Sequence, residues 1–238
     1  MTRTCAVIVA GGCGSRFGNA RGKLLVDVAG RPLLTWAVEA FDRSALTDAI
    51  VVVCQEERTD EMRRCAIEPF GFSSPVSFAP AGGTRQDSSR AGVMAAAAGS
   101  FDIVAIHDGA RPLIRPETID AALGMLEAAP ELDGVVCGQP AVDTLKLMDG
   151  ERIESTPPRS SYWTVQTPQI FRVPVMLSAY ELADAEGFAG TDDSSVVERA
   201  GGNVVCMQSP RDNIKVTMPE DLFMADALLR ARLEQADA

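Results

Sequence analysis

The stretch VIVAGGCGSRFGNARGK, residues 7–23, decides the fold of this chain. Its first four residues, 7–10, are apolar, as in a strand of a parallel sheet that is buried on both faces. Glycines then allow the backbone to turn sharply and bring its N–H groups close to a ligand. They are Gly11, Gly12 and Gly14. Arg16 and Lys23 add two cations, so the stretch predicts a cradle for a triphosphate.

The glycine spacing differs from that of the common nucleotide-binding loops. A Walker loop requires Ser or Thr after its lysine, whereas Leu24 follows Lys23 here. In the dinucleotide fingerprint G-x-G-x-x-G, Phe17 occupies the place of the last glycine and Gly18 comes one residue late. A purely structural turn therefore remains open as an alternative until other motifs are considered.

Length and composition limit the class of protein. The chain has 238 residues, of which 46% are hydrophobic, enough to bury the core of one α/β domain or of two small ones. No apolar run approaches the ~18–20 residues of a membrane span. The apolar run at residues 5–10 is also too short for the core of a signal peptide. We therefore predict a cytoplasmic protein that does not bind membranes.

Charge and reactive side chains exclude several functions. A net charge of -11 disfavours nonspecific binding to nucleic acid or to an anionic membrane. His107 is the only histidine, which rules out a zinc site with two histidines and disfavours a Ser-His-Asp hydrolase. None of the six cysteines forms a C-x-x-C pair. Four of them lie in or beside apolar runs and are expected to be buried free thiols: Cys5, Cys54, Cys137 and Cys206.

Strand and helix patterns alternate along the chain, which is typical of a parallel sheet with helices on both faces. Apolar runs predict strands at residues 7–10, 49–54, 76–78, 103–106, 134–138 and 204–207. Helical spacing predicts helices near 32–41, 56–67, 87–98, 116–129, 174–186 and 219–233, with a short one opening at 191–194. No repeat or linker divides the chain, so a single domain over residues 1–238 is the simplest account.

Residues 140–167 depart from this alternation. Strand-like pieces are separated by turns, and Asp149-Gly150 between two of them is a hairpin signal. The segment contains Thr144 and Arg159 but few residues that could form a core of its own. It is therefore expected to project from the sheet as an arm that needs a partner surface, with an ordinary surface hairpin as the alternative.

Other polar motifs fall where strands end. Asp108 and Arg111 follow the strand at 103–106, and ligands of open α/β sheets lie beyond the carboxyl ends of the strands. Gly82-Gly83 forms a second glycine turn before a helix that Asp87 or Ser88 would cap. Near the end of the chain, Thr217-x-x-Glu220 has the pattern of a capping box.

Taken together, five blocks resemble 2-C-methyl-D-erythritol 4-phosphate cytidylyltransferases, enzymes of the non-mevalonate isoprenoid pathway. The blocks are the glycine loop with Arg16 and Lys23, His107-Asp108-x-Ala110-Arg111-Pro112, Asp143-Thr144-x-Lys146, Arg159 with Thr167-Pro168-Gln169, and 212–217, DNIKVT. The resemblance runs from residue 5 to about 230. It implies a Rossmann-like, three-layer nucleotidyltransferase fold with a projecting β-hairpin arm.

The resemblance also implies roles for individual residues. It assigns catalysis at the CTP phosphates to Arg16 and Lys23. It assigns nucleotide binding to Ala10, Gly11, Gly12, Gly14, Gly82, Gly83, Ser88, Asp108 and Gly109. It assigns the acceptor phosphate site to Arg111, Thr144, Arg159, Lys215, Thr167 and Thr191. Mg²⁺ is the expected cofactor; no residue is assigned as its ligand, although Asp108 is the strongest contributor. The arm would cross to a second subunit of a homodimer.

Two alternatives stay open at this point. Ribitol-5-phosphate cytidylyltransferases share the glycine loop, the Asp-Arg block and Thr-Pro-Gln, although Asp143-Thr144-Leu145-Lys146 resembles the methylerythritol branch more. The other alternative is a catalytically silent nucleotide-binding module, against which the cations Arg16, Lys23 and Lys215 argue. The sequence departs from the family pattern at Gly22 and Leu24, which flank Lys23, and at Gly109, where alanine is usual. These changes remove no charged group, so activity is expected to survive.

Overall fold

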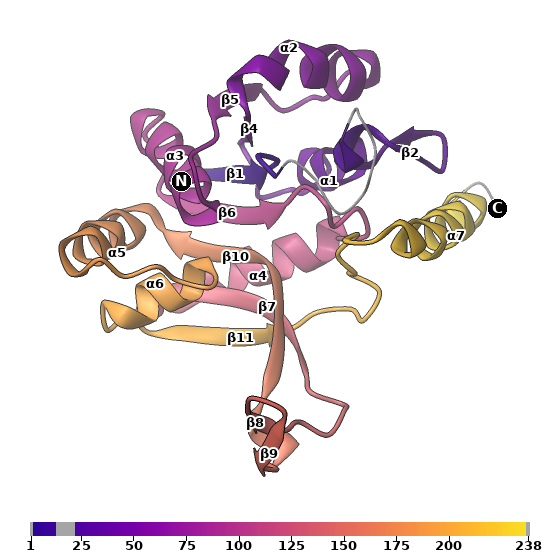
Figure 1. The fold of residues 1–238 in the computed structure, drawn as a ribbon. Helices are drawn as coiled ribbons and strands as arrows, with labels where there is room; N and C mark the ends of the chain where they lie inside the picture. Colours follow the sequence, from indigo (N-terminus) through magenta and orange to yellow (C-terminus); the bar gives the residue numbers. More distant parts are fainter. Residues whose placement is uncertain (1, 13–21, 237–238) are drawn as a thin grey trace.

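A seven-stranded sheet forms the centre of the molecule (Figure 1). The computed structural model describes residues 2–12 and 22–236. The strands of the sheet are β1 (Thr4–Val9), β4 (Ala49–Cys54), β5 (Val76–Pro80), β6 (Ile103–Asp108), β7 (Gly134–Pro140), β10 (Trp163–Arg172) and β11 (Val204–Gln208). Their order is β11-β7-β10-β6-β1-β4-β5, and the predicted strands are all present.

The sheet is mostly parallel, as predicted, and β10 is the exception. It pairs antiparallel with both β6 and β7. The arm predicted at residues 140–167 does not end there: its last segment continues as β10 into the centre of the sheet, before the helix predicted from residue 174. Pro168 lacks an N–H, which is unfavourable in a central strand. The structure accommodates it where the register with β7 shifts, between Val165 and Gln169.

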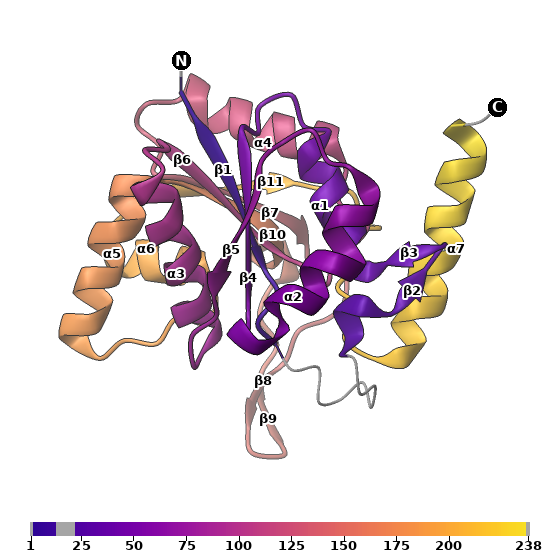
Figure 2. The same ribbon diagram turned by 90° about the horizontal axis from the view of Figure 1, so that it is seen from above.

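Helices cover both faces of the sheet, which gives the three layers (Figure 2). One face carries α1 (Leu33–Asp42), α4 (Pro116–Ala128) and α7 (Pro219–Ala236), and the other carries α3 (Arg85–Ala98), α5 (Val173–Glu186) and α6 (Asp193–Arg199). Alternate residues of β1 point to opposite faces, with Ile8 in the first core cluster and Val7 in the second. Gly92 lets α3 approach closely, since a Cβ there would lie 2.2 Å from Val7 Cγ1.

Three local predictions need correction. The helix predicted at 56–67 is present, but it is not a regular α-helix. It is a continuous run of short helical segments: the 3-10 helix η3 (Glu56–Arg58), α2 (Thr59–Met62), the π-helix η4 (Arg63–Ile67) and the 3-10 helix η5 (Glu68–Phe70). Helix α3 is capped by Thr84, not by Asp87 or Ser88; Asp87 is its capping-box partner. At α7, the carboxylate that binds Thr217 belongs to Asp221 and not to Glu220, which lies one residue too early.

The predicted hairpin at Asp149-Gly150 is present and projects from the sheet (Figure 1). It consists of β8 (Leu147–Asp149) and β9 (Arg152–Ser155), and every residue of both strands is exposed. The short turn η6 (Arg159–Ser161) then leads into β10. A second, smaller hairpin of β2 (Asp27–Val28) and β3 (Arg31–Pro32) follows the turn η2 (Lys23–Leu25) and contacts α7. Among the described residues, none of the helices has the length and apolar character needed to cross a membrane.

Candidate active site

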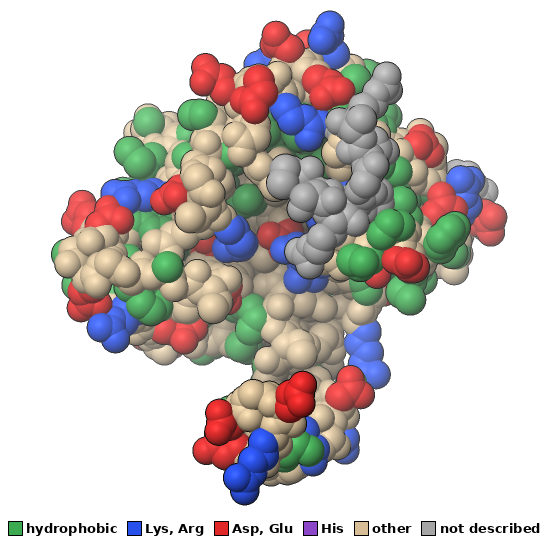
Figure 3. Space-filling model, viewed as in Figure 1, with side chains coloured by type: hydrophobic (Ala, Val, Ile, Leu, Met, Phe, Trp, Pro, Cys, Tyr) green, Lys and Arg blue, Asp and Glu red, His purple; other side chains and the backbone are tan. Residues whose placement is uncertain are grey.

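A cavity of about 410 Å³ opens at the carboxyl ends of β1, β4, β5 and β6. This is the edge at which parallel α/β sheets bind ligands. The cavity is lined by Val9, Ala10, Gly11, Gly12, Lys23, Leu24, Gln55, Gly82, Gly83, Thr84, Arg85, Ser88, Asp108, Ala110 and Lys215. Lysine and arginine side chains gather near the centre of this face (Figure 3). Segments far apart in the sequence therefore build one pocket with cationic walls.

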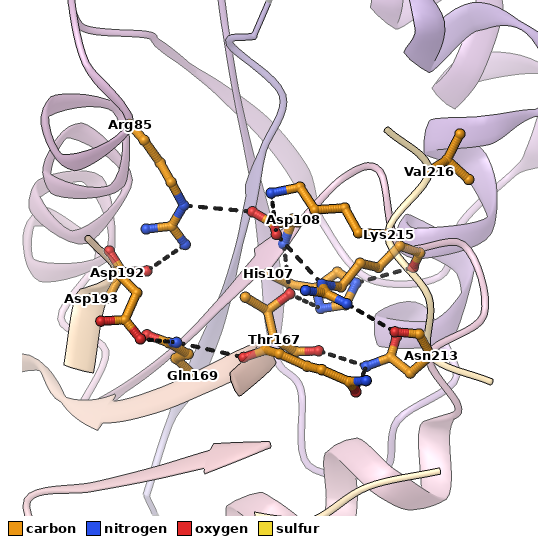
Figure 4. A network of polar contacts seen from close by, with 12 residues as sticks. Arg85, His107, Asp108, Thr167, Gln169, Asp192, Asp193, Asn213, Lys215 and Val216 are labelled. Carbon is orange, nitrogen blue, oxygen red and sulfur yellow. Dashed lines mark hydrogen bonds and ion pairs between the residues drawn. The ribbon is translucent and has the colours of Figure 1, made fainter. Parts of the chain in front are cut away.

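Asp108 is the centre of the charged cluster at this pocket (Figure 4). Its Oδ2 lies 2.8 Å from Lys215 Nζ and 3.4 Å from Arg111 Nε, and its Oδ1 lies 3.6 Å from Arg85 Nε. Burial alone would raise the pKa of Asp108, but the charges of Lys215 and Arg85 hold it well below its usual range. The carboxylate therefore stays ionised and keeps three cations together.

His107 and Thr167 brace the end of β6 beneath Asp108. Thr167 Oγ1 accepts a hydrogen bond from the backbone N–H of Asp108 at 3.0 Å and lies 3.1 Å from His107 Nδ1. His107 Nε2 lies 3.2 Å from the carbonyl oxygen of Arg111. A carbonyl only accepts, so Nε2 bears the proton and Nδ1 accepts from Thr167. Burial lowers the pKa of His107 to about 4, so the ring is neutral and serves as a structural brace.

The nucleotide-binding candidates meet at the other side of the cavity. Ser88 Oγ accepts from the N–H of Gly82 at 3.2 Å and donates to the carbonyl of Thr84 at 2.9 Å. Gln55 Nε2 donates to the carbonyl of Gly11 at 3.1 Å. Glycine is required at position 11, because a Cβ there would lie 2.6 Å from the Cβ of Ala81. Small residues thus bring backbone N–H and C=O groups to the wall of the pocket.

Lys23 lies on the rim of the same cavity, directly after Gly22 in a left-handed conformation with φ of 70°. Its Nζ donates to the carbonyl oxygen of Val216 at 2.7 Å. Lys23 and Lys215 are therefore brought to adjacent parts of the site by one contact between distant segments. Arg16 and Gly14 lie outside the described residues.

The residues proposed for the acceptor divide into two groups. Arg111 belongs to the central cluster, where its Nη1 donates to the carbonyl of Asn213 at 2.9 Å. Asn213 in turn donates to the carbonyl of Thr167 at 2.9 Å, which fixes the segment that carries Lys215. Gly109, which the resemblance assigns to nucleotide binding, lies next to this cluster: it directly follows Asp108, and its backbone N–H donates to the carbonyl of Val9 at 3.0 Å.

The second group has no contact with the central cluster among the described residues. Thr144 and Arg159 lie on the projecting arm, where Arg159 Nη1 donates to the carbonyl of Val142 at 2.7 Å. Thr191 is exposed and directly precedes Asp192, the N-cap of α6. Within one subunit, the structure therefore brings together Lys23, Arg111 and Lys215 but leaves the arm residues apart from them.

Sequence reasoning missed several residues of the site. Arg85 lines the cavity and pairs with Asp108 and with the buried carboxylate of Asp193. Its position directly after the second glycine turn was the available signal. Gln55, directly after β4, could have been found by applying to it the strand-end rule that identified Asp108.

A twisted, mostly parallel sheet with a cationic pocket at its carboxyl edge places the chain among α/β nucleotidyltransferases. The family model for 2-C-methyl-D-erythritol 4-phosphate cytidylyltransferase matches residues 4–231. The chain therefore belongs to the 2-C-methyl-D-erythritol 4-phosphate cytidylyltransferase family.

Individual relatives agree with this assignment over nearly the whole chain. A protein of this name from Geobacter metallireducens is 38% identical over 230 residues, which cover 96% of this chain and 98% of the relative. Another from Syntrophotalea carbinolica is 40% identical over 223 residues and covers 94% of both chains.

Solved structures show the same architecture. The 4-diphosphocytidyl-2C-methyl-D-erythritol synthase of Anaerococcus prevotii superposes with a TM-score of 0.83 at 26% identity, covering 96% of this chain and 99% of that one. The 2-C-methyl-D-erythritol 4-phosphate cytidylyltransferase of Thermus thermophilus gives a TM-score of 0.74 at 29% identity, covering 97% and 100%.

Proposed function

We propose that this chain joins CTP to 2-C-methyl-D-erythritol 4-phosphate, giving 4-diphosphocytidyl-2-C-methyl-D-erythritol and diphosphate. Membership of the family supports the choice of substrates. The single structural observation behind the proposal is that Lys23 and Lys215 line one cavity together with Asp108, which lies 2.8 Å from Lys215. Two polyanions can be brought together only where fixed positive charge offsets their repulsion.

The reaction needs charge stabilisation more than it needs proton transfer. An oxygen of the acceptor phosphate forms a bond to the α-phosphorus of CTP, and the bond from that phosphorus to the bridging oxygen breaks as diphosphate leaves. A phosphate monoester has a second pKa of about 6, so the nucleophile is already anionic near neutral pH. The buried, neutral His107 fits this chemistry, because the acceptor requires no general base.

Each residue proposed for the site then has a defined task. Lys23 and Arg16 neutralise the phosphates of CTP, while Arg111 and Lys215 bind the acceptor phosphate. Small residues recognise cytosine through backbone groups and leave too little room for a purine: Ala10, Gly82, Gly83 and Ser88 on the cavity wall, and Gly109 next to Asp108. Gly11 and Gly12 of the glycine loop approach the phosphates of CTP. Thr167, whose hydroxyl is already bonded beneath Asp108, holds this arrangement in place.

Mg²⁺ would arrive with the nucleotide. Among the described residues that line the cavity, Asp108 is the one carboxylate, and its oxygens already face three cations. Across the described part of the chain, His, Cys, Asp and Glu form no cluster of three that could hold a metal. These residues fit an ion held mainly by phosphate oxygens and water, as is common for Mg²⁺, with Asp108 as the protein group beside it. When bound, the ion supplies further neutralisation of phosphate charge.

An assay with two acceptors tests the proposed function. Purified protein, CTP and Mg²⁺ are combined with either 2-C-methyl-D-erythritol 4-phosphate or ribitol 5-phosphate, and diphosphate release is followed. We expect turnover with the methylerythritol substrate and at least ~10²-fold lower kcat/KM with ribitol phosphate, since mismatched buried polar groups discriminate strongly. Preference for ribitol phosphate would instead indicate a ribitol-5-phosphate cytidylyltransferase. CTP binding without turnover on either acceptor would indicate a silent module.

We further propose that the chain acts in the cytoplasm as a homodimer, with each arm reaching the partner's site. The arm exposes large apolar side chains that have no core of their own: Val142, Leu147, Met148, Ile153, Tyr162 and Trp163. Thr144 and Arg159 would then contact the acceptor bound by the other subunit. Two-fold symmetry places the same pair of contacts in both sites.

Mixing two inactive variants tests this shared site. Lys23→Ala and Arg159→Ala are each expected to have little activity alone, but subunit exchange creates heterodimers in which one of the two sites has neither defect. A 1:1 mixture should therefore recover about a quarter of wild-type turnover. Absence of recovery after demonstrated exchange, or a fully active monomer in sedimentation, would refute the shared site.

A further inference from the structure

Helix α3 begins at the wall of the cavity, and an ion pair joins its first residue to the first residue of α6. Helix α3 begins at Arg85 after its N-cap Thr84, and α6 begins at Asp193 after its N-cap Asp192. The first turn of a helix favours acidic side chains and disfavours cations. The dipole of α6 therefore stabilises the negative charge of Asp193, whereas the dipole of α3 destabilises the positive charge of Arg85. Contacts outside α3 must therefore stabilise the charge of Arg85.

Two carboxylates hold the Arg85 guanidinium in place (Figure 4). Arg85 Nη2 lies 2.8 Å from Asp193 Oδ2, and Arg85 Nε lies 3.6 Å from Asp108 Oδ1. The Asp193 side chain is 1% exposed, while that of Arg85 is 32% exposed. Asp193 is therefore buried where it contacts Arg85, while part of the Arg85 side chain remains open to solvent at the cavity.

Electrostatics agree with a fixed, fully charged arginine. Burial alone would lower the pKa of Arg85, but Asp193 and Asp108 raise it above its usual value. Burial raises the pKa of Asp193, and the charge of Arg85 opposes that rise. A buried ion pair is weak evidence for stability, because desolvation offsets most of the attraction. Stability alone therefore does not explain a buried carboxylate at position 193.

Arg85 retains binding capacity toward the cavity. A guanidinium has five N–H donors, and its contacts with the described residues involve Nη2 and Nε. Nη1 has no partner in this part of the chain. The planar fork of arginine matches the oxygens of a phosphate group, and Arg85 lines the cavity beside the Gly82-Gly83 turn.

We propose that Asp193 is a positioning residue that orients Arg85, and that Arg85 is a further cation contacting the phosphates of CTP. This inference rests on the proposed cytidylyl transfer. Asp193 touches neither substrate and acts only through the guanidinium. Removing the carboxylate of Asp193 should therefore weaken CTP binding about as much as removing the guanidinium of Arg85.

A double-mutant cycle tests the proposal. KM for CTP and kcat are measured for the wild type, Arg85→Ala, Asp193→Asn and the double variant. Loss of one charge-assisted contact should raise KM for CTP by about 10-fold in each single variant, with kcat changed less than ~3-fold. The double variant should resemble Arg85→Ala, because Asp193 has no other route to the nucleotide. Multiplied effects in the double variant, or a wild-type KM in Asp193→Asn, would overturn the proposal.

Val197→Ala is the matched control for a merely structural effect. Val197 is fully buried on α6, so its truncation loosens the same helix without changing charge. It should lower the melting temperature and leave KM for CTP within ~2-fold of wild type; a 10-fold rise would overturn the assigned route through Arg85. If Asp193→Asn does not fold, Arg85→Ala decides alone, and a wild-type KM there refutes the proposal.

Failure of the proposed cytidylyl transfer can be distinguished from failure of the proposed role of Arg85 and Asp193. If the wild type shows no turnover, the proposed function is wrong. CTP affinity of the same variants, measured by calorimetry, then still decides whether Arg85 and Asp193 act as a pair.

Discussion

Replacing Lys23 with alanine is expected to lower kcat for cytidylyl transfer by about 10²–10³-fold, the usual loss for one preorganised donor at a site of developing charge. Lys23 lies on the rim of the cavity, and its Nζ is 2.7 Å from the Val216 carbonyl. The melting temperature should change little, because a half-exposed hydrogen bond contributes only about 1 kcal/mol. Steady-state diphosphate release and thermal unfolding measure the two effects.

Arg230→Ala is the control for this variant. Arg230 is an exposed cation on α7 whose partner is Asp226, within the same helix. It should retain wild-type turnover, since exposed pairs of this kind contribute little. Wild-type turnover in Lys23→Ala as well would remove Lys23 from the mechanism.

The second large effect is expected at Lys215. Lys215→Ala should lower kcat/KM for the acceptor by about 10²–10³-fold, because it removes the cation that lies 2.8 Å from Asp108 and faces the cavity. Folding should survive, since Asp108 keeps Arg85 and Arg111 as partners. Initial rates at varied acceptor and saturating CTP give this ratio. An unchanged ratio in a folded variant would place the acceptor phosphate elsewhere.

Strand ends made much of the site predictable from the sequence. Asp108 and Arg111 were placed at the ligand-binding edge because they follow an apolar run. In the structure Asp108 lines the cavity together with Gly11 and Gly12, and Arg111 lies 3.4 Å from Asp108. Parallel strands bring their carboxyl ends to one edge, so this inference needed only local patterns. The contact between Asp108 and Lys215 was harder, because it joins residues far apart in the chain.

Other features depend on tertiary contacts that local patterns do not contain. β10 was missed because Pro168 and its polar neighbours look unlike a central strand, yet Thr167 is buried there to brace Asp108. Arg85 was missed because a cation in the first turn of a helix has no local reason to be there. Its reason is Asp193, which lies more than one hundred residues later.

The charged cluster explains how one small edge can receive two phosphorylated substrates. Asp108 offsets part of the repulsion among Arg85, Arg111 and Lys215. A cluster that is held before the substrates arrive needs little reorganisation during the reaction. In this account, fixed cations direct the acceptor phosphate onto CTP in one displacement, without a covalent intermediate on the protein.

The most direct test of that claim is the stereochemical course at the α-phosphorus. CTP made chiral there by one sulfur atom is converted with 2-C-methyl-D-erythritol 4-phosphate, and the configuration of the product is determined. A single in-line attack predicts inversion. Retention would require two successive displacements and would contradict the account.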